Sequence, residues 1–153
     1  MTRPGLTNTV AASIAYPIVA VPRATSALPQ TGALTIFVVS GGRVKLINIT
    51  GQVTVQVGAV ANNTQLLHGT TALCANLNLT GDVIGTRYSI TGTFANVMVE
   101  TAPNLPINEQ TLEVVLPPGN VVLDCDGSDG GVGRVRWTLV YIPLEAGASV
   151  VAA

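Results

Sequence analysis

The fold class of this chain is decided by the stretch Arg134-Val135-Arg136-Trp137-Thr138-Leu139-Val140-Tyr141. Every second residue from Val135 to Tyr141 is large and apolar, whereas two arginines and a threonine take most of the positions beside them. Successive side chains of a β-strand point to opposite faces of its sheet, so a period of two predicts a strand with one buried face. We therefore expect Trp137 and Tyr141 in the core of a β-sheet protein.

Strand-like runs of this kind occur over most of the chain. Val53, Val55 and Val57 alternate with polar residues, and Leu73–Thr80 alternates in the same way. Other runs with strand character are Leu34–Val39, Val44–Ile49, Tyr88–Ile90, Ala95–Val99, Leu112–Leu116 and Val121–Cys125. Turn-forming residues separate these runs at Gly41-Gly42, Thr50-Gly51, Asn62-Asn63, Thr80-Gly81, Thr91-Gly92, Pro117–Asn120 and Gly130-Gly131. This pattern predicts an all-β fold, an antiparallel two-sheet sandwich or a barrel-like domain, with no helix longer than two turns.

The two ends of the chain differ from the middle. Residues 1–32 contain four of the nine prolines, which excludes a continuous helix or a central strand there, and we expect an extended N-terminal arm. Residues 33–145 form the expected β domain, and residues 146–153 form a small, apolar C-terminal tail. The apolar residues that we expect to contact a partner are Tyr16, Ile18, Val19, Val21, Val150 and Val151. The rival arrangement packs both ends on their own domain, with the arm as an edge strand.

Charge is scarce in this sequence. Only 10% of the 153 residues are charged, against about 25% in an ordinary soluble domain, and the net charge is -1. A surface with so little charge has weak electrostatic protection against association, which predicts an oligomer or a protein docked on a larger assembly. The alternative is a monomer kept soluble by hydroxyl and amide groups.

Composition also argues against two classes of partner. The seven basic residues form no cluster of the kind that binds nucleic acid. The apolar stretch Ala11–Val21 is interrupted by Ser13 and Pro17, and it is shorter than the about 20 residues of a membrane-spanning helix. The N-terminus also lacks the basic segment and apolar core of a signal peptide. We therefore expect a soluble, unsecreted protein that binds neither nucleic acid nor membrane.

Candidate catalytic and metal-binding residues are few. The single histidine, His68, has no cysteine or carboxylate at ligand spacing, so we expect it to be structural or exposed. Strand parity places Cys74 on the polar face of its strand and Cys125 on an apolar face, which favours two free thiols over a disulfide. The sequence shows no phosphate-binding loop, no catalytic carboxylate pair and no nucleophile motif. It predicts no enzyme, no cofactor and no small-molecule substrate.

The acidic stretch Asp124–Gly131 is the one segment with the look of a metal site. It holds three of the four aspartates of the chain beside glycines, as the start of a calcium loop does. The glycine spacing is wrong for an EF-hand, and no glutamate closes the loop. We predict a solvated hairpin tip without metal, with calcium binding as the alternative.

The last twenty residues, from Arg134 through Pro143-Leu144-Glu145 and Gly147-Ala148 to Ala153, resemble the closing strand and tail of small β-rich virion proteins of tailed bacteriophages. Those proteins are often capsid decoration, or cement, proteins. The resemblance implies a homotrimer that sits at pseudo-threefold positions of an icosahedral head, binds the major capsid protein and bridges neighbouring capsomers. It places the protein on the capsid surface of the virion, after assembly in the host cytoplasm.

Two other classes remain open from the sequence. A phage tail or fibre component, or a receptor-binding β module, would use the same strands with a groove or exposed aromatic residues at its tip. A small β-barrel enzyme or ligand carrier would need a polar-lined cavity, against which the aliphatic inward faces argue.

Overall fold

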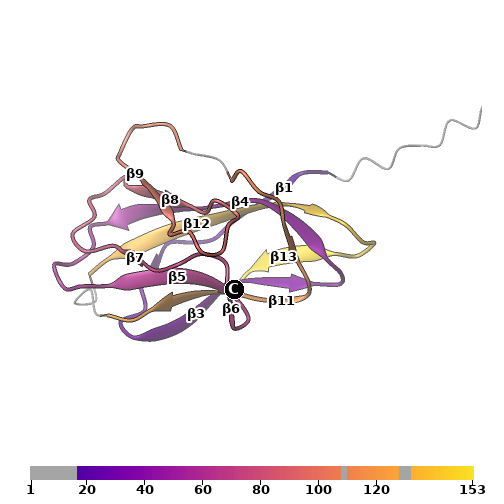
Figure 1. The fold of residues 1–153 in the computed structure, drawn as a ribbon, viewed down its shortest axis with the longest axis horizontal. Helices are drawn as coiled ribbons and strands as arrows, with labels where there is room; N and C mark the ends of the chain where they lie inside the picture. The colour runs from indigo at the N-terminus through magenta and orange to yellow at the C-terminus, as the bar shows by residue number, and fades with distance from the viewer. Residues whose placement is uncertain (1–16, 108–109, 128–131) are drawn as a thin grey trace, which may run out of the picture.

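The computed structural model describes residues 17–107, 110–127 and 132–153 of the chain. These residues form strands, turns and loops with no helix, and the strands make two antiparallel sheets that do not close into a barrel (Figure 1). The all-β, two-sheet prediction is confirmed.

Sheet A contains seven strands, of which β12 and β4 are the central pair. The order is β1-β12-β4-β8-β9, while β2 also pairs with β12 and β10 with β4. The bounds are β1 (Val19–Pro22), β2 (Ser26–Ala27), β4 (Val44–Val55), β8 (Arg87–Ser89), β9 (Val99–Thr101), β10 (Val114–Leu116) and β12 (Arg134–Pro143).

Sheet B contains six strands in the order β13-β3-β11-β5-β6, with β7 beside β5. The bounds are β3 (Gly32–Ser40), β5 (Asn63–His68), β6 (Thr71–Ala72), β7 (Leu77–Asn78), β11 (Gly119–Cys125) and β13 (Ser149–Ala152). The chain crosses between the two sheets several times, for example at Gly41-Gly42, where β3 of sheet B leads into β4 of sheet A.

The core lies between the sheets and is centred on Trp137, whose side chain is fully buried as the sequence predicted. Trp137 pairs with Gly51 on β4, and Gly51 pairs in turn with Tyr88 on β8. A Cβ on Gly51 would lie 2.8 Å from the Trp137 ring, so the glycine leaves room for the indole. The Trp137 and Tyr88 rings stack over this position with centroids 6.3 Å apart.

This arrangement corrects one turn prediction. Thr50-Gly51 was expected to separate two strands, but both residues lie inside the single strand β4. Glycine serves here as a gap for the neighbouring aromatic ring, a role that a local sequence window does not distinguish from a turn.

The predicted strand Leu73–Thr80 is also corrected. Only Leu77-Asn78 of this run forms a strand, because the chain bends after β6. Cys74 therefore turns inward and is buried, with its Sγ accepting a hydrogen bond from the Leu66 backbone N–H at 3.3 Å. The polar-face placement of Cys74 was wrong, although both Cys74 and Cys125 are free thiols as expected. The predicted strand Ala95–Val99 is likewise shortened, since only Val99 belongs to β9.

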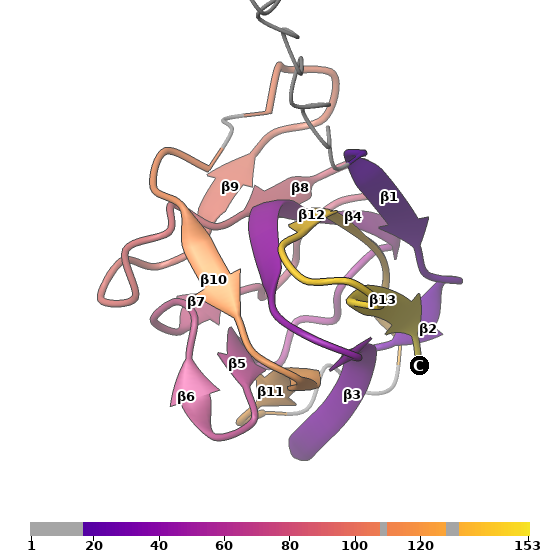
Figure 2. The ribbon, with the colours of Figure 1, turned by 90° about the vertical axis from the view of Figure 1, so that its right-hand side faces the viewer.

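Both described chain ends lie together on one side of the sandwich, which we call the closed flank (Figure 2). Val21 of β1 pairs with Leu139, and Val151 of β13 pairs with Val38. The Arg23 Nε donates a hydrogen bond of 2.9 Å to the backbone oxygen of Ala153. Residues 19–27 and 149–152 thus pack on their own domain, which is the alternative that the sequence left open beside contact with a partner.

The opposite side, which we call the open flank, is built from the edge strands β6 and β10 and the loop between β8 and β9. These edge strands are two and three residues long. On this side of the molecule, an isolated β-bridge between Ala75 and Val97 joins the segments that flank the two sheets.

Candidate functional site

The residues predicted to contact a partner divide into exposed and buried ones. Ile18 is 67% exposed and Val151 is 52% exposed. Val19 and Val21 are partly buried against the core, and Val150 is only 5% exposed. The remaining residue of that set, Tyr16, lies outside the described residues. A partner on the closed flank would therefore meet Ile18 and Val151.

Strand alternation explains why Val150 and Val151 differ. Val150 faces the core of sheet B, where its backbone N–H donates a hydrogen bond of 3.2 Å to the Tyr141 hydroxyl. Val151 is the next residue and points away. The sequence-based prediction placed Val150 and Val151 on the same partner-contacting surface. The pairing of β13 with β3 instead directs these two side chains to opposite faces of the sheet.

The open flank carries an apolar hollow of about 220 Å3. It is lined by His68, Thr71, Leu73, Phe94, Val114, Val115, Leu116 and Pro117. Phe94 and Val115 are 47% and 48% exposed, although both are large apolar side chains. On β10, Val114 and Leu116 face the core, so Val115 faces outward.

His68 has a structural place beside this hollow. Its Nε2 lies 2.9 Å from the Pro117 backbone oxygen, at hydrogen-bonding distance. Gly119 has a φ of +156°, and a Cβ there would lie 3.0 Å from the imidazole ring. The ring therefore packs against the segment that leads into β11.

Two acidic residues, Asp82 and Glu100, form an acidic pair at the β8–β9 edge of sheet A. The Tyr88 hydroxyl donates a hydrogen bond of 2.5 Å to the Asp82 carboxylate, and Tyr88 pairs with Glu100 across β8 and β9. Burial raises the pKa of Asp82 above its ordinary value, although the Tyr88 hydrogen bond opposes that shift. Burial and the nearby Asp82 charge raise the pKa of Glu100 as well. Burial and the same carboxylate also raise the pKa of Tyr88.

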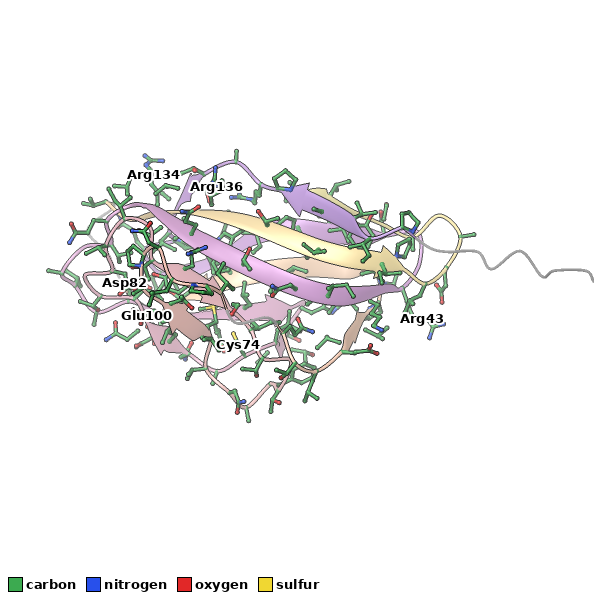
Figure 3. The ribbon with its side chains drawn as sticks, turned by 90° about the horizontal axis from the view of Figure 1, so that it is seen from above. Arg43, Cys74, Asp82, Glu100, Arg134 and Arg136 are labelled. Carbon is green, nitrogen blue, oxygen red and sulfur yellow. The ribbon has the colours of Figure 1, made fainter. Side chains whose placement is uncertain are left out.

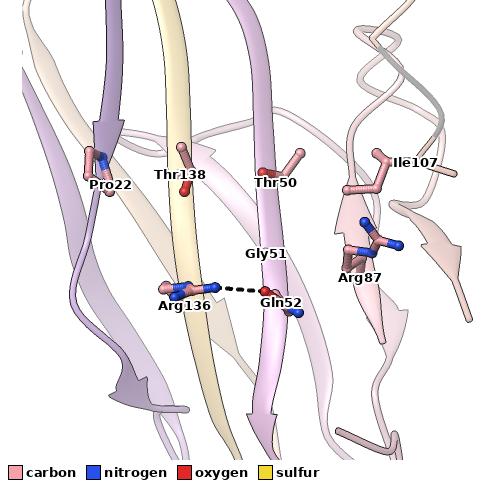
Figure 4. A pocket seen from close by; sticks show the side chains of 8 residues that line it. All are labelled: Pro22, Thr50, Gly51, Gln52, Arg87, Ile107, Arg136 and Thr138. Carbon is pink, nitrogen blue, oxygen red and sulfur yellow. Dashed lines mark hydrogen bonds between the residues drawn. The ribbon is translucent and has the colours of Figure 1, made fainter. Parts of the chain in front are cut away.

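The outer face of sheet A bears three arginines, which we call the arginine face: Arg87, Arg134 and Arg136. Arg136, Gln52 and Arg87 stand in one row across β12, β4 and β8. The Arg136 guanidinium donates a hydrogen bond of 2.9 Å to the Gln52 Oε1 (Figure 4). Arg134 and Arg136 lie near each other at one end of the molecule, and Arg43 lies at the other (Figure 3).

The acidic stretch is described as far as Gly127. Asp124 accepts a hydrogen bond of 3.2 Å from Gln65, and Asp126 accepts bonds from the backbone and the side chain of Asn63 at 3.0 and 3.2 Å. Residues 128–131 lie outside the described residues, so the solvated tip stays a prediction. In the described ranges, no three histidine, cysteine, aspartate or glutamate side chains gather in a way that could hold a metal.

Comparisons with other proteins identify no relative. No family model, no curated protein and no solved structure matches this chain. Within residues 17–107, 110–127 and 132–153, no helix has the length and apolar character needed to cross a membrane.

Two surfaces were not predicted from the sequence: the hollow on the open flank and the arginine face. The hollow with Phe94 and Val115 joins segments from both sheets, so no local pattern predicts it. The arginine face had one local signal, since Arg134 and Arg136 share a strand face, but Arg87 joins them only through the pairing of β4 with β8.

Proposed function

We propose that this chain is a structural protein of a tailed-phage virion, a capsid decoration protein that binds the outer surface of the head and stabilises contacts between capsomers. The closing strand and tail, Arg134 to Ala153, support the assignment to virion proteins by their resemblance. The scarcity of charged residues supports a protein whose surface meets other proteins.

The observation that carries the adhesive role is the hollow on the open flank. Phe94 and Val115 border it while about half exposed, next to an edge strand of only three residues. Covering such side chains with a partner contributes about 1 kcal/mol each, because burying a whole side chain of this size contributes about 1.5–3 kcal/mol. Contacts of this size become strong only when several copies act together, which favours a multivalent assembly.

The proposed assembly is a homotrimer seated on the major capsid protein at pseudo-threefold positions. Three copies would present three open flanks, and each would bridge a boundary between neighbouring capsomers. The proposed role involves no nucleic acid, no membrane, no cofactor and no small-molecule substrate.

The test uses heads and tails prepared separately from particles that carry the chain. The double variant Phe94→Ser, Val115→Ser should keep its melting temperature but lose most of its co-sedimentation with heads. The matched control, Val83→Ser, Ile84→Ser, removes two apolar side chains that are 48% and 63% exposed and do not line the hollow, and it should bind normally. Sedimentation velocity of the free protein should show a trimer.

Three results would contradict the proposal. Binding of the wild-type chain to tails and not to heads would make it a tail component. Equal binding by both double variants would remove the open flank from the interface. A wild-type chain that stays monomeric and binds no part of the particle would exclude the structural role.

A further inference from the structure

We propose that the arginine face is a binding site for carboxylate groups of a protein partner, that is, for an acidic segment with aspartate or glutamate side chains. This site lies on the outer face of sheet A, away from the hollow of the open flank, and the proposal does not depend on attachment to a capsid.

The backbone pairing brings the guanidinium groups into one row. Gln52 of β4 pairs with Arg136 of β12 on one side and with Arg87 of β8 on the other. Directly paired residues of antiparallel strands lie about 4.5–5.5 Å apart at Cα, so Arg136 and Arg87 are about 10 Å apart. Long side chains on two such strands reach the same small group placed between them.

The row encloses a recess with both charge and hydroxyl groups. A hollow of about 280 Å3 is lined by Pro22, Thr50, Gly51, Gln52, Arg87, Ile107, Arg136 and Thr138. Thr138 and Thr50 are paired with each other across β12 and β4, two residues along the strands from Arg136 and Gln52, and form a second polar row (Figure 4). A ligand in this recess meets guanidinium groups along one side and hydroxyl groups along the other.

The charges of the arginine face have no counter-charge among the described residues. The ion pairs that the described chain forms are Arg43 with Glu145 and Lys45 with Glu113. Arg87 donates one hydrogen bond to the Leu105 backbone oxygen, but its buried Nε has no partner in the described residues. Arg136 is held by Gln52, a neutral acceptor. Three cations on one sheet face with only neutral acceptors attract an anion.

Guanidinium geometry selects the kind of anion. The planar fork of arginine donates two parallel N–H bonds to a carboxylate, and such charge-assisted bonds are among the strongest in proteins. The hydrogen bond to Gln52 holds the Arg136 fork over β4, which lowers the entropy lost when a carboxylate binds.

The surroundings of the recess favour a protein over an acidic saccharide. Proteins bind sugars largely by stacking them on aromatic rings, and the described lining of this recess includes proline, isoleucine and threonine but no aromatic side chain. An extended peptide segment that lies along a sheet face projects its acidic side chains at regular spacing.

The test is a titration of the isotope-labelled full chain followed by two-dimensional NMR. The probe is a hexaglutamate peptide with blocked termini, and the comparison ligands are a galacturonate oligomer and a hexalysine peptide. We expect the glutamate peptide to shift the backbone amide signals of Thr50–Gln52, Arg87 and Arg136–Thr138, and added salt to weaken its binding. The hexalysine peptide should shift none of them.

Variants separate the site from general charge attraction. Arg136→Gln and the double variant Arg87→Gln, Arg136→Gln should each weaken peptide binding by about tenfold or more, since hydrogen bonds to charged groups contribute about 1.5–3 kcal/mol. Arg43→Gln removes the same charge at the other end of the molecule and should leave binding within about twofold. Arg136 is exposed, so its single variant tests the site even if the change at half-buried Arg87 disturbs the fold.

The proposal is overturned by any of four results. These are no amide shifts with the glutamate peptide, shifts confined to the region of Arg43 and Lys45, unchanged affinity in Arg136→Gln, and binding of the galacturonate oligomer at least as tight as that of the peptide. The last result would make the arginine face a site for acidic saccharides.

Discussion

The two flanks of the sandwich differ in the strands that form the edges of the sheets and in the apolar side chains left exposed there. On the closed flank, the edges of both sheets are formed by the chain ends, β1 and β13, which lie side by side. On the open flank, the edges are strands of two and three residues, and Phe94 and Val115 remain about half exposed. The closed flank therefore contributes to the stability of the domain itself, while the open flank leaves apolar side chains exposed.

Exposed edges and apolar patches usually mark either an aggregation hazard or an interface. Short strands reduce the hazard on the open flank because they offer few backbone groups to a passing chain. We expect changes on the closed flank to alter the free energy of unfolding, and changes on the open flank to alter it little.

The largest effect should follow removal of residues 1–30. This deletion takes away β1 and β2, exposes one edge of β12, and removes Leu28, which is 3% exposed, together with Val19 and Val21. The loss of this buried apolar surface should lower the free energy of unfolding by more than about 3 kcal/mol or prevent folding. Chemical denaturation monitored by circular dichroism measures it.

The matched control is removal of residues 1–16, which leaves β1 and β2 intact. This shorter deletion should cost far less than the longer one. If the two deletions destabilise the domain equally, β1 contributes nothing, and the contrast between the flanks fails.

A smaller but sharper effect is expected on β13. Val150→Asp would place a carboxylate in the core and should lower the free energy of unfolding by about 3 kcal/mol or more. Val151→Asp changes the outward neighbour and should cost less than about 0.5 kcal/mol. Thermal melting of the two variants compares them directly, and equal losses would mean that β13 does not pair with β3 in solution.

The next largest loss of stability is expected when the hydrogen bond that joins the two chain ends on the closed flank is removed. Arg23→Met removes the hydrogen bonds from Arg23 to the Ala153 backbone oxygen and to the Ser26 hydroxyl, and should cost about 1 kcal/mol. Arg134→Met removes an exposed arginine whose guanidinium makes no hydrogen bond or ion pair within the described residues, and it should be nearly neutral. An Arg23 variant as stable as the Arg134 variant would show that the two ends are not tied together.

The smallest effect concerns the acidic pair at the edge of sheet A. Because the pKa of Asp82 is raised in the fold, the folded state binds its proton more tightly than the unfolded state. Stability from this group is therefore present below the ordinary carboxyl pKa and is lost as pH rises through the folded pKa. Asp82→Asn should remove that loss, and its amide oxygen can still accept the Tyr88 hydrogen bond.

The variant should then gain less than about 1 kcal/mol at neutral pH relative to the wild-type chain, with the difference shrinking toward acidic pH. Melting temperatures over that pH range measure the difference. A loss of stability at neutral pH that shrinks toward acidic pH would mean that the charge on Asp82 strengthens the Tyr88 hydrogen bond by more than burial costs it.

Local alternation determined the class of this fold. The period of two from Val135 to Tyr141 correctly predicted β12 and the burial of Trp137, because strand geometry assigns neighbours to opposite faces whatever the rest of the chain does. Gly41-Gly42 was also predicted as a turn and joins β3 to β4, since positive φ is a local property of glycine.

Strand pairing, which is not local, determined everything that the sequence left open. Position 51 inside β4 is a glycine because a side chain there would collide with the Trp137 ring. No residue near Gly51 in the sequence indicates that this ring is its neighbour. Cys74 is buried because the chain bends after β6 and not because of its parity. Arg87 and Arg136 are 49 positions apart by their numbers, and they share a face only through their common neighbour Gln52. Pairing register depends on contacts between distant segments, so only the tertiary structure could decide which side chains meet.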